Sequence, residues 1–391
     1  MRILHVINNL GSGGAERLVA ESLPLMKAYP GVEVELLLLT EANSVFLEGL
    51  KKEGIKVTSL NSGKNIYSIY NPLNILKIAK EITKKSYDIV HVHLFPAQYW
   101  VALAKIFIKS RDFKLLTTEH STNNRRRGKF YFRPIDRFIY SLYDCIISIS
   151  PSTQENLLIW LKPATEESKK YRIIENGINL DNFCNAIPYD KRELSQFITN
   201  ETRTICMVGR FTEAKDHATL IQAMQRLPEH VHLLLVGEGP LRQEKEKLVV
   251  EMGLGKRVHF LGFRRDVERI IKTVDVVVLS SNWEGLPLAV LEGMAAGKPV
   301  IASRVPGLKD VVEDEEMLFE VGNDWELAEK INKLLNDECL YNEKARQAKQ
   351  RSERYDIRNM VDKYMETYFE LCGTQIYKDD NKKGGKKCKS S

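Results

Sequence analysis

Residues 274–303, VDVVVLSSNWEGLPLAVLEGMAAGKPVIAS, contain one complete strand–helix–strand unit. The run VDVVVLS is apolar on both faces, which is typical of a strand buried in a parallel sheet. A turn that contains Gly285 follows, and Pro287 then suits the first turn of the apolar helix LPLAVLEGMAAG. The second apolar run, KPVIAS, returns as a strand. This order predicts a βαβ crossover, and therefore an α/β fold with a mostly parallel sheet.

The same alternation of short apolar runs and longer amphipathic stretches extends over most of the chain. It predicts two Rossmann-like, doubly wound domains whose sheets face a central cleft, because α/β sheets bind ligands at the carboxyl ends of their strands. We place the domains at residues 1–187 and 188–354. A helix at residues 355–372 follows, and the basic tail at 373–391 is predicted to be disordered. The expected strands contain RILHVIN, VEVELLLL, DIVHVHL, FKLLTT, CIISIS, YRII, TICMVGRF, VHLLLVG, RVHFLGF, VDVVVLS and KPVIAS.

Composition limits the classes of function. The chain has 391 residues, of which 43% are hydrophobic and 28% charged, values typical of a globular protein with more than one core. No apolar run reaches the roughly 18 residues of a membrane span, and the N-terminus has no signal-peptide pattern, so a cytoplasmic location is expected. The six cysteines include no CxxC pair, which argues against zinc sites and disulfides. The net charge of +6 is modest, and no nucleic-acid-binding module accompanies it.

Two glutamates in the first stretch are candidate ligand-binding groups. Glu284 lies in the turn after a buried strand, and so at the mouth of the expected cleft. Glu292 lies more than one turn into a helix of apolar and small residues, where a carboxylate is costly unless it meets hydrogen-bond donors. Sugar hydroxyls are such donors. The alternative is that Glu284 only stabilises the helix dipole and that Glu292 is a charge on the helix face.

The segment GRFTEAKDHATL, residues 209–220, carries two cations after another expected strand. Arg210 follows the strand directly, and Lys215 precedes a helix that Asp216 can cap. Arginine offers a planar fork to phosphate oxygens and lysine a point charge, so the two suit a diphosphate. The alternative is a solvated pair of loop charges.

A glycine-rich loop, NNLGSGGAE at residues 8–16, connects the first strand to the first helix. Glycines such as Gly13 and Gly14 let the backbone approach a phosphate at a helix N-terminus. The dinucleotide fingerprint GxGxxG is not met, because Glu16 occupies the position of the third glycine. The alternative is a tight turn without a ligand.

Three histidines, His91, His93 and His120, lie at strand ends that should face the cleft. Alternation along VHVHL places His91 and His93 on the same face of the sheet. We expect these two to be structural or to contact the acceptor. No carboxylate lies at a spacing that would complete a metal site with the three histidines.

Residues 123–140, NNRRRGKFYFRPIDRFIY, interleave basic and aromatic side chains. Such a stretch can lie on anionic lipid, with roughly 1 kcal/mol from each basic residue near the surface. We therefore predict peripheral contact of residues 125–138 with the inner face of the cell membrane. The alternative is a loop, followed by an ordinary helix whose aromatic side chains pack inward. The basic residues of this stretch are Arg125, Arg126, Arg127, Lys129, Arg133 and Arg137.

Taken together, Gly209-Arg210-Phe211, Lys215-Asp216 and the spacing of Glu284 and Glu292 resemble the retaining glycosyltransferases of family 4 (group 1 type), which have the GT-B fold. The loop from Gly13 to Glu16 and the motifs HVHLFPAQY, TTEHS, ENGIN and VGEGP extend this resemblance over nearly the whole chain. It implies transfer of a sugar, with retention of configuration, from a nucleotide diphosphate, for which UDP is expected. The implied acceptor is a glycan or a lipid-linked sugar in the biosynthesis of a surface polysaccharide such as capsule or exopolysaccharide. The last helix would cross back onto the first domain.

The resemblance also implies roles for individual residues. Arg210 and Lys215 would hold the diphosphate, so neither a divalent metal nor another cofactor is expected. Glu292 would bind the ribose, while Glu284 and His120 would contact the transferred sugar. The other implied donor contacts are Gly13 and Gly14 over the phosphates, backbone amides near Gly285 and Leu286 along the sugar and phosphate, and Gly262 and Phe263 beside the base.

Two other classes of protein stay open at this point. Two Rossmann-like halves also suit an NAD-dependent oxidoreductase, against which the failed fingerprint at Glu16 argues. A protein of the same fold could bind a nucleotide sugar without turnover, but Arg210, Lys215, Glu284 and Glu292 are all in place.

Overall fold

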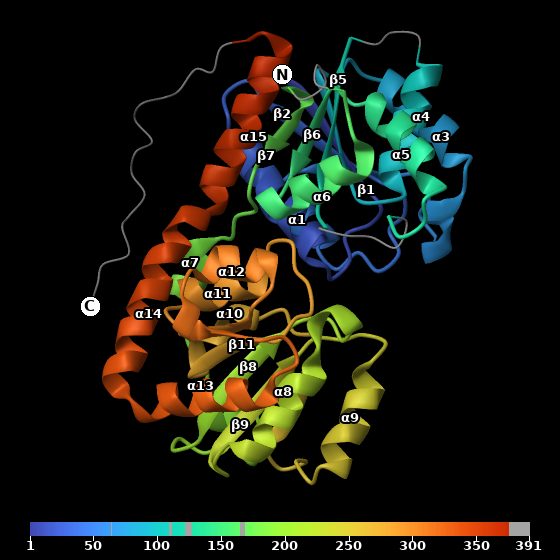
Figure 1. The fold of residues 1–391 in the computed structure, drawn as a ribbon. Coiled ribbons are helices and arrows are strands. Elements are labelled where there is room, and N and C mark those ends of the chain that lie inside the picture. The colour runs from blue at the N-terminus through green and yellow to red at the C-terminus, as the bar shows by residue number, and fades with distance from the viewer. Residues whose placement is uncertain (64, 109–111, 122–126, 165–168, 375–391) are drawn as a thin grey trace. The chain divides into compact units, whose positions relative to one another are not determined.

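In a computed structural model, the described residues are 1–63, 65–108, 112–121, 127–164 and 169–374. The chain divides into two compact units (Figure 1). The first contains Met1–Gly177 and the residues from Ile357 onward, and the second contains Ile178–Asp356. The sequence-based boundaries, at residues 187/188 and 354/355, lie near the two points where the chain passes from one unit to the other. The tail predicted to be disordered lies outside the described residues from residue 375 onward.

The first unit is built on a seven-stranded parallel sheet in the order β3-β2-β1-β4-β5-β6-β7. The chain order reverses between β1 and β4, which makes their carboxyl ends the topological switch point. The sequence analysis missed β3, an edge strand without a fully buried residue and therefore without an apolar run. The strands are β1 (Arg2–Ile7), β2 (Glu33–Leu38), β3 (Lys56–Ser59), β4 (Ile89–His93), β5 (Lys114–Glu119), β6 (Cys145–Ser148) and β7 (Tyr171–Ile173).

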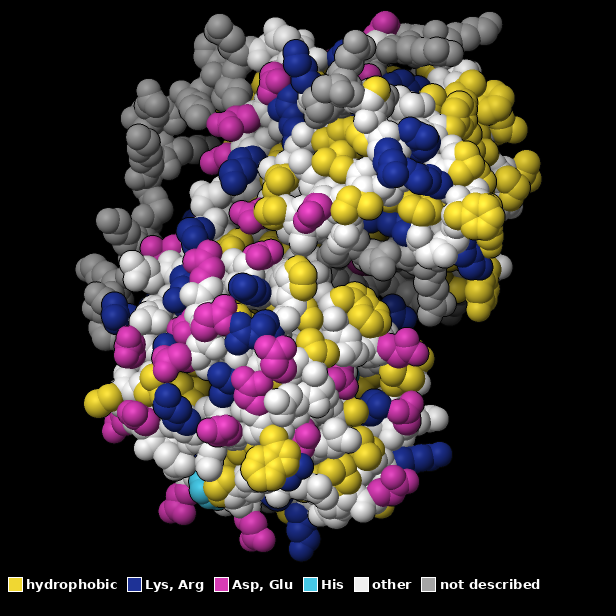
Figure 2. Space-filling model, viewed as in Figure 1, with side chains coloured by type: hydrophobic (Ala, Val, Ile, Leu, Met, Phe, Trp, Pro, Cys, Tyr) yellow, Lys and Arg dark blue, Asp and Glu magenta, His cyan; other side chains and the backbone are white. Residues whose placement is uncertain are grey.

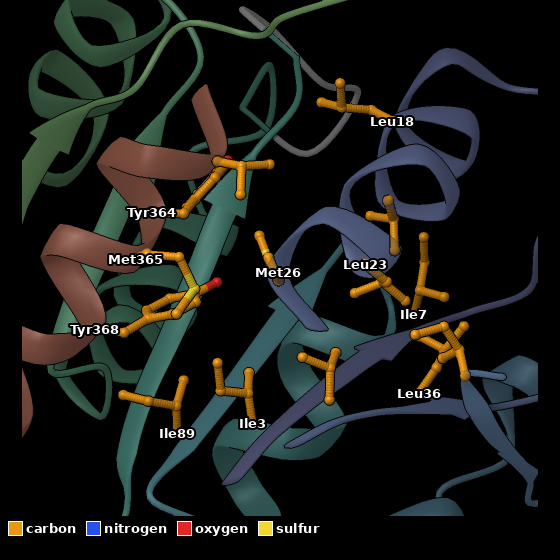
Figure 3. Close-up of a cluster of buried hydrophobic side chains, with 14 of the residues drawn as sticks. Ile3, Ile7, Leu18, Leu23, Met26, Leu36, Ile89, Tyr364, Met365 and Tyr368 are labelled. Atoms are coloured by element: carbon orange, nitrogen blue, oxygen red, sulfur yellow. The ribbon is translucent and has the colours of Figure 1, made fainter. Parts of the chain in front are cut away.

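Helices cover both faces of this sheet. Along β1, Ile3 and Ile7 pack with α1, α2 and α15, while Leu4 and Val6 pack on the other face with α3 to α6. Figure 3 shows the first of these clusters, in which side chains of α1 and α15 meet over the strands. The last helix therefore belongs to the first unit, as expected. The helices are α1 (Gly14–Lys27), α2 (Leu47–Lys52), α3 (Asn74–Thr83), α4 (Ala97–Phe107), α5 (Phe132–Ser141), α6 (Pro151–Leu161) and α15 (Ile357–Cys372).

The second unit has a six-stranded parallel sheet in the order β10-β9-β8-β11-β12-β13. Its switch point lies between β8 and β11. The sequence analysis missed β13, because two residues are too few to show a strand period. The strands are β8 (Arg203–Val208), β9 (Val231–Val236), β10 (Val258–Gly262), β11 (Val276–Leu279), β12 (Val300–Ser303) and β13 (Leu318–Phe319). The helices are α7 (Leu180–Cys184), α8 (His217–Ala223), α9 (Arg242–Glu251), α10 (Val267–Thr273), α11 (Leu288–Ala295), α12 (Pro306–Val312), α13 (Asp324–Asn336) and α14 (Glu338–Ser352).

The stretch 274–303 forms the predicted crossover, from β11 through α11 to β12. Pro287 lies immediately before the helix, at its N-cap. A Cβ atom on Gly293 would lie 3.0 Å from the Cβ of Val277, so α11 packs unusually close to its own strand. Among the described residues, no helix is both long enough and apolar enough to span a membrane.

Candidate active site

The carboxyl end of β8 presents Arg210 to solvent. Gly209 N donates to Val236 O at 2.9 Å, and Phe211 N donates to Glu238 O at 3.1 Å, so this loop is tied to the loop after β9. A Cβ atom on Gly237 would lie 2.1 Å from Gly209 O, which explains why only glycine fits this approach. The Arg210 side chain is exposed and forms no ion pair with any residue that the structure describes. Its guanidinium is therefore available to an anion.

Lys215 and Glu284 form an ion pair at the ends of β8 and β11. Lys215 Nζ lies 2.5 Å from Glu284 Oε1, and Ser281 Oγ donates to the same oxygen at 2.7 Å. The two charged side chains are only 20% and 12% exposed. Asp216 caps α8 by accepting from Thr219, as predicted, and so holds the chain directly after Lys215. The sequence analysis gave Lys215 and Glu284 separate roles, and the structure brings them together.

Glu292 is buried on α11, with 3% of its surface exposed. Burial, and after it the negative charge of Glu292, raises the pKa of the Cys206 thiol on β8. The carboxylate therefore lies near β8, one of the two central strands of this sheet. The alternative that Glu292 is a solvated charge on the helix face is wrong.

The remaining donor-side candidates of the second unit follow the same edge of the sheet. Gly262, at the end of β10, has a φ of +67° and accepts from Gly237 N at 2.8 Å. Phe263 is 41% exposed beside it. Gly285 O would lie 2.3 Å from a Cβ atom on Gly307, so the turn after β11 packs on the start of α12. Leu286, in the same turn, is buried.

The glycine-rich loop of the first unit is closed by its own glutamate. Gly13 is the N-cap of α1, and Gly14 is the first residue of the helix. A Cβ atom on Gly13 would lie 2.2 Å from Glu16 Oε2. The Glu16 carboxylate thus occupies the side of Gly13, and a phosphate bound there would require it to turn away.

Four histidines cluster on one face of the first sheet. His5 and His91 lie within β1 and β4, His93 ends β4, and His120 follows β5 directly. His5 Nδ1 lies 3.0 Å from His93 Nε2, and His93 Nδ1 lies 3.1 Å from His120 Nε2. The His91 and His93 ring centroids are 4.3 Å apart, which confirms that both face the same side of the sheet. The sequence analysis missed His5. Its signal was available in RILHVIN, where His5 shares a strand face with the buried residues Ile3 and Ile7.

Burial keeps all four rings neutral near pH 7. It lowers the pKa of His5 to about 3 and that of His120 to about 4, from an ordinary value of 6.5. Burial, and after it the charge of neighbouring histidines, lowers the pKa of His91 and His93 well below 6.5. Nitrogens of His5, His91 and His93 lie within 4.8 Å of one another, a spacing that a metal ion could bridge. In the structure, however, both His91 nitrogens are hydrogen-bonded, Nδ1 to Tyr368 at 2.6 Å and Nε2 to Thr118 at 2.8 Å.

The basic-aromatic stretch divides into buried and exposed parts. The prediction of membrane contact is wrong for Arg127, because its side chain is only 6% exposed and pairs with Glu119 at 2.8 Å. Arg125 and Arg126 lie outside the described residues. Phe130, at 85% exposure, and Phe138 both face outward, so the alternative of inward-packed aromatics is wrong for them.

Further exposed hydrophobic residues lie on the neighbouring helices α3 and α4 and on the 3₁₀ helix Ile66–Tyr70. Figure 2 shows hydrophobic side chains gathered over this region, with lysines and arginines among them. We call this surface the aromatic patch. Its hydrophobic members are Tyr67, Tyr70, Leu73, Leu76, Ile106, Phe107, Phe130, Tyr131, Ile135 and Phe138, and its exposed basic members include Lys77, Lys80, Lys129 and Arg137.

Two doubly wound units, the second with a lysine, a glutamate and an exposed arginine at the carboxyl edge of its sheet, are typical of the GT-B type of glycosyltransferase. Comparison with protein families agrees. The family described as "Glycosyltransferase Family 4" matches residues 12–182, and the one described as "Glycosyl transferases group 1" matches residues 190–354. The chain belongs to these group 1 and family 4 glycosyltransferases and is an enzyme of that class.

Named relatives span most of the chain. It is 27% identical over 355 residues, 90% of this chain and 94% of the relative, to the N-acetylgalactosamine-N,N'-diacetylbacillosaminyl-diphospho-undecaprenol 4-alpha-N-acetylgalactosaminyltransferase of Campylobacter jejuni. It is 29% identical over 266 residues, 64% of this chain and 67% of the relative, to the UDP-Gal:alpha-D-GlcNAc-diphosphoundecaprenol alpha-1,3-galactosyltransferase of Escherichia coli. The solved structure of Anabaena Alr3699/HepE in complex with UDP and glucose has the same fold, with a TM-score of 0.81 and 21% identity over 95% of this chain and all of that one.

Proposed function

We propose that this enzyme moves a sugar from a UDP-sugar to a lipid-linked or growing glycan, with retention of configuration, in the biosynthesis of a surface polysaccharide such as capsule or exopolysaccharide. The observation that carries the proposal is the Lys215–Glu284 pair beside the exposed Arg210. These three groups sum to one positive charge, which favours a diphosphate over a neutral ligand. The names of two relatives support the substrates, since one names UDP-Gal and both name diphosphate-linked undecaprenol acceptors.

The chemistry of the proposal is electrostatic. The bond from the anomeric carbon to the phosphate oxygen breaks, and negative charge grows on the departing diphosphate. Arg210 and Lys215 stabilise that charge where it develops, so no metal ion or other cofactor is required in this proposal. The acceptor hydroxyl attacks from the side on which the diphosphate leaves, and its proton passes to a departing phosphate oxygen.

The other side chains have supporting roles in the proposal. The Glu284 carboxylate accepts hydrogen bonds from hydroxyl groups of the transferred sugar. Lys215 and Ser281 hold this carboxylate in position. Glu292 binds the ribose as a buried carboxylate with vicinal hydroxyls as donors. His120 contacts the transferred sugar. The contacts of Gly13, Gly14, Gly262, Phe263, Gly285 and Leu286 with the donor stay predictions.

Binding of a nucleotide-sugar panel tests the donor side. Thermal shift should show stabilisation by UDP-sugars that persists in EDTA, because the cations of the protein replace a metal. Lys215→Ala should lose that stabilisation. Lys309→Ala removes an exposed lysine of α12 that lies 3.9 Å from Glu315 and serves as the control. Stabilisation only by another nucleotide class, or only with added metal, would contradict the proposed donor or its metal independence, and a shift with NAD alone would favour an oxidoreductase.

The aromatic patch suits an enzyme with a lipid-linked acceptor. Exposed aromatic rings can enter the lipid headgroup region, while lysines and arginines beside them attract anionic headgroups. We expect the enzyme to work on the cytoplasmic side, with this patch against the inner face of the membrane.

Vesicle sedimentation tests this contact. The double substitution Phe130→Asp and Phe138→Asp should release the enzyme from vesicles that contain an anionic phospholipid. Val250→Asp is the matched control, because Val250 is 75% exposed in the second unit. Equal sedimentation of both variants with the wild type would refute the membrane contact and would leave the donor proposal intact.

A further inference from the structure

Three histidine rings form one continuous chain of hydrogen bonds in the first unit. The chain runs from His5 on β1 through His93 on β4 to His120 after β5. Each link joins two ring nitrogens, His5 Nδ1 to His93 Nε2 at 3.0 Å and His93 Nδ1 to His120 Nε2 at 3.1 Å. His5 and His93 are buried, with 1% and 4% of their surface exposed, so water cannot take the place of either link.

The protonation of the three rings is coupled by this geometry. A neutral imidazole has one N–H and one lone pair, and a hydrogen bond between two rings needs one of each. If His5 donates from Nδ1, then His93 accepts at Nε2 and must donate from its own Nδ1. His120 then accepts at Nε2 and carries its proton at Nδ1. If both hydrogen bonds are instead donated in the opposite direction, from His120 towards His5, all three rings carry the proton at Nε2. No mixed set of tautomers satisfies both links.

The two ends of the chain decide between these sets. Neither His5 Nε2 nor His120 Nδ1 has a hydrogen-bond partner among the described residues. His5 is permanently enclosed, and a buried N–H without an acceptor is rarer in proteins than a buried acceptor without a donor. The unpaired nitrogen of His5 is therefore the lone pair. His120 Nδ1 is buried as well, but His120 is a partly exposed residue directly after β5, whereas His5 is enclosed within β1. Only the Nδ1 of His120 can therefore gain an acceptor from a bound ligand, and we assign the N–H to it.

We propose that His5 and His93 are positioning residues that fix His120 as the Nδ1–H tautomer, so that His120 donates a hydrogen bond from Nδ1 to an oxygen of the transferred sugar. This inference rests on the proposed role of His120 at that sugar. It assigns a function to His5, which lies two strands away from His120 in the sheet. A bound sugar oxygen supplies the acceptor that His120 Nδ1 lacks.

His91 lies beside this chain and is not a member of it. Its two nitrogens are bonded to Tyr368 of α15 and to Thr118 of β5. Thr118 Oγ1 also lies 3.3 Å from the hydroxyl of Tyr364. These contacts join α15 to the sheet and occupy both His91 nitrogens. A metal ion bound by His5, His91 and His93 would have to break hydrogen bonds of the His5–His93 link and of His91.

Nuclear magnetic resonance of the enzyme labelled with ¹⁵N-histidine tests the tautomers directly, because a protonated ring nitrogen and a lone-pair nitrogen have well-separated shifts. At pH 7.5 we expect His5, His93 and His120 all to carry the proton at Nδ1. An Nε2–H form or an imidazolium at any one of the three rings overturns the proposal. So does a shift of their lone-pair nitrogens to metal-bound values when Zn²⁺ is added.

Variants of His5 test the consequence for catalysis. His5→Leu should give His120 a mixture of tautomers and lower kcat about tenfold, with KM within about twofold of the wild type. His5→Asn places an amide N–H near the former Nδ1 position and should restore the His120 tautomer and most of kcat. An unchanged His120 tautomer and unchanged kcat in His5→Leu would overturn the proposal.

The control comes from a second histidine pair in the other unit. His232 Nδ1 lies 3.0 Å from His259 Nε2, and His232 is 8% exposed, so His232→Leu removes a similar ring from a similar link. It should leave the His120 tautomer unchanged. Full transfer activity in His120→Ala would remove the proposed role of His120, while the tautomers of the wild type would still test the chain. If His5→Leu does not fold, the wild-type spectrum decides by itself.

Discussion

The carboxyl edges of the two sheets carry polar side chains of opposite character. In the first unit, the ends of β4 and β5 hold the neutral histidines His93 and His120, which are bonded to each other and, through His93, to the buried His5 of β1. In the second unit, the ends of β8 and β11 hold the charged pair Lys215–Glu284 and an exposed guanidinium, that of Arg210. The corresponding edge of two similar sheets therefore carries uncharged side chains in the first unit and charged side chains in the second.

The difference follows from the cost of burial. A neutral imidazole can be enclosed when its nitrogens are hydrogen-bonded, whereas an isolated charge cannot. Lys215 and Glu284 instead form an ion pair and remain partly exposed. Such a pair can exchange partners when an anion arrives, while the buried histidines can only orient what they touch. We expect substitutions in the second unit to change ligand affinity and catalysis, and most substitutions in the first to change stability.

The largest effect is expected from the loss of charge in the second unit. Lys215→Ala should lower kcat by roughly 10²–10³-fold, the usual cost of removing one group that stabilises developing negative charge. Enzyme assays with a saturating UDP-sugar measure it, with Lys309→Ala as the control. A decrease below about threefold would show that the charged edge does not carry the chemistry, and the comparison between the two edges would lose its functional meaning.

The next effect concerns pH and the first unit. The pKa of His5 is about 3 in the folded chain and has its ordinary value of 6.5 when unfolded. The unfolded chain therefore takes up a proton that the folded chain refuses. The contribution of His5 to stability is complete above pH 6.5 and decreases as the pH falls, by about 3 kcal/mol at pH 4.

Urea unfolding at several pH values between 7.5 and 4.5 measures this dependence. The slope for the wild type should exceed that for His5→Leu by about one proton, since the variant lacks the group that titrates. The comparison with the variant isolates His5 from other buried histidines, such as His217, whose pKa burial also lowers to about 3. Parallel slopes would mean that His5 is protonated in the folded chain, which is incompatible with a neutral cluster.

A smaller effect is expected from Glu292, the buried carboxylate on α11 of the second unit. Glu292→Ala should weaken UDP binding by roughly 10–100-fold, because hydrogen bonds to a charged group contribute about 1.5–3 kcal/mol. Isothermal titration with UDP measures it. Glu292→Gln keeps the size of the side chain and one acceptor oxygen, so its loss should be smaller. Equal affinity of the wild type and Glu292→Ala would remove the ribose role.

Sequence reasoning found the fold because buried parallel strands are apolar on both faces, as in VDVVVLS and VHLLLVG. It missed β3 and β13, since an exposed edge strand and a two-residue strand have no such pattern. It identified Arg210, Lys215, Glu284 and Glu292 as candidates, because charged groups after strands or among apolar residues stand out. The sequence did not reveal that two of these candidates form a pair. Lys215 and Glu284 are 69 positions apart, and their contact depends on the order of the strands in the sheet.

The same limit applies to His5 and Arg127. His5 lies in the middle of an apolar strand, where a single histidine is ordinarily a satisfied core residue. Only the neighbouring positions of β1 and β4 in the sheet bring it to His93. Arg127 belongs to a run of basic residues that favours a surface position. Its partner Glu119 lies at the end of β5 and is itself held by Gln98 at 2.8 Å, so this buried acceptor draws the arginine inward.

The smallest effects compare one hydroxyl at each edge. Ser281 Oγ donates to Glu284 at 2.7 Å, and Thr118 Oγ1 is bonded to His91 at 2.8 Å, and both residues are fully buried. Ser281→Ala should lower kcat several-fold by loosening Glu284, with a change of less than about 1 kcal/mol in the free energy of unfolding, because Lys215 still holds the carboxylate.

Thr118→Val removes the same kind of bond from the neutral edge. It keeps the shape of the side chain but leaves one His91 nitrogen unpaired, which should cost about 1–3 kcal/mol of stability and leave kcat within about twofold. Urea unfolding and initial rates on both variants measure the two quantities side by side. A variant pair with the opposite pattern, Ser281→Ala unstable but active and Thr118→Val stable but slow, would reverse the assignment of the two edges. Because each substitution removes a single hydroxyl, such a reversal could not be attributed to a difference in size.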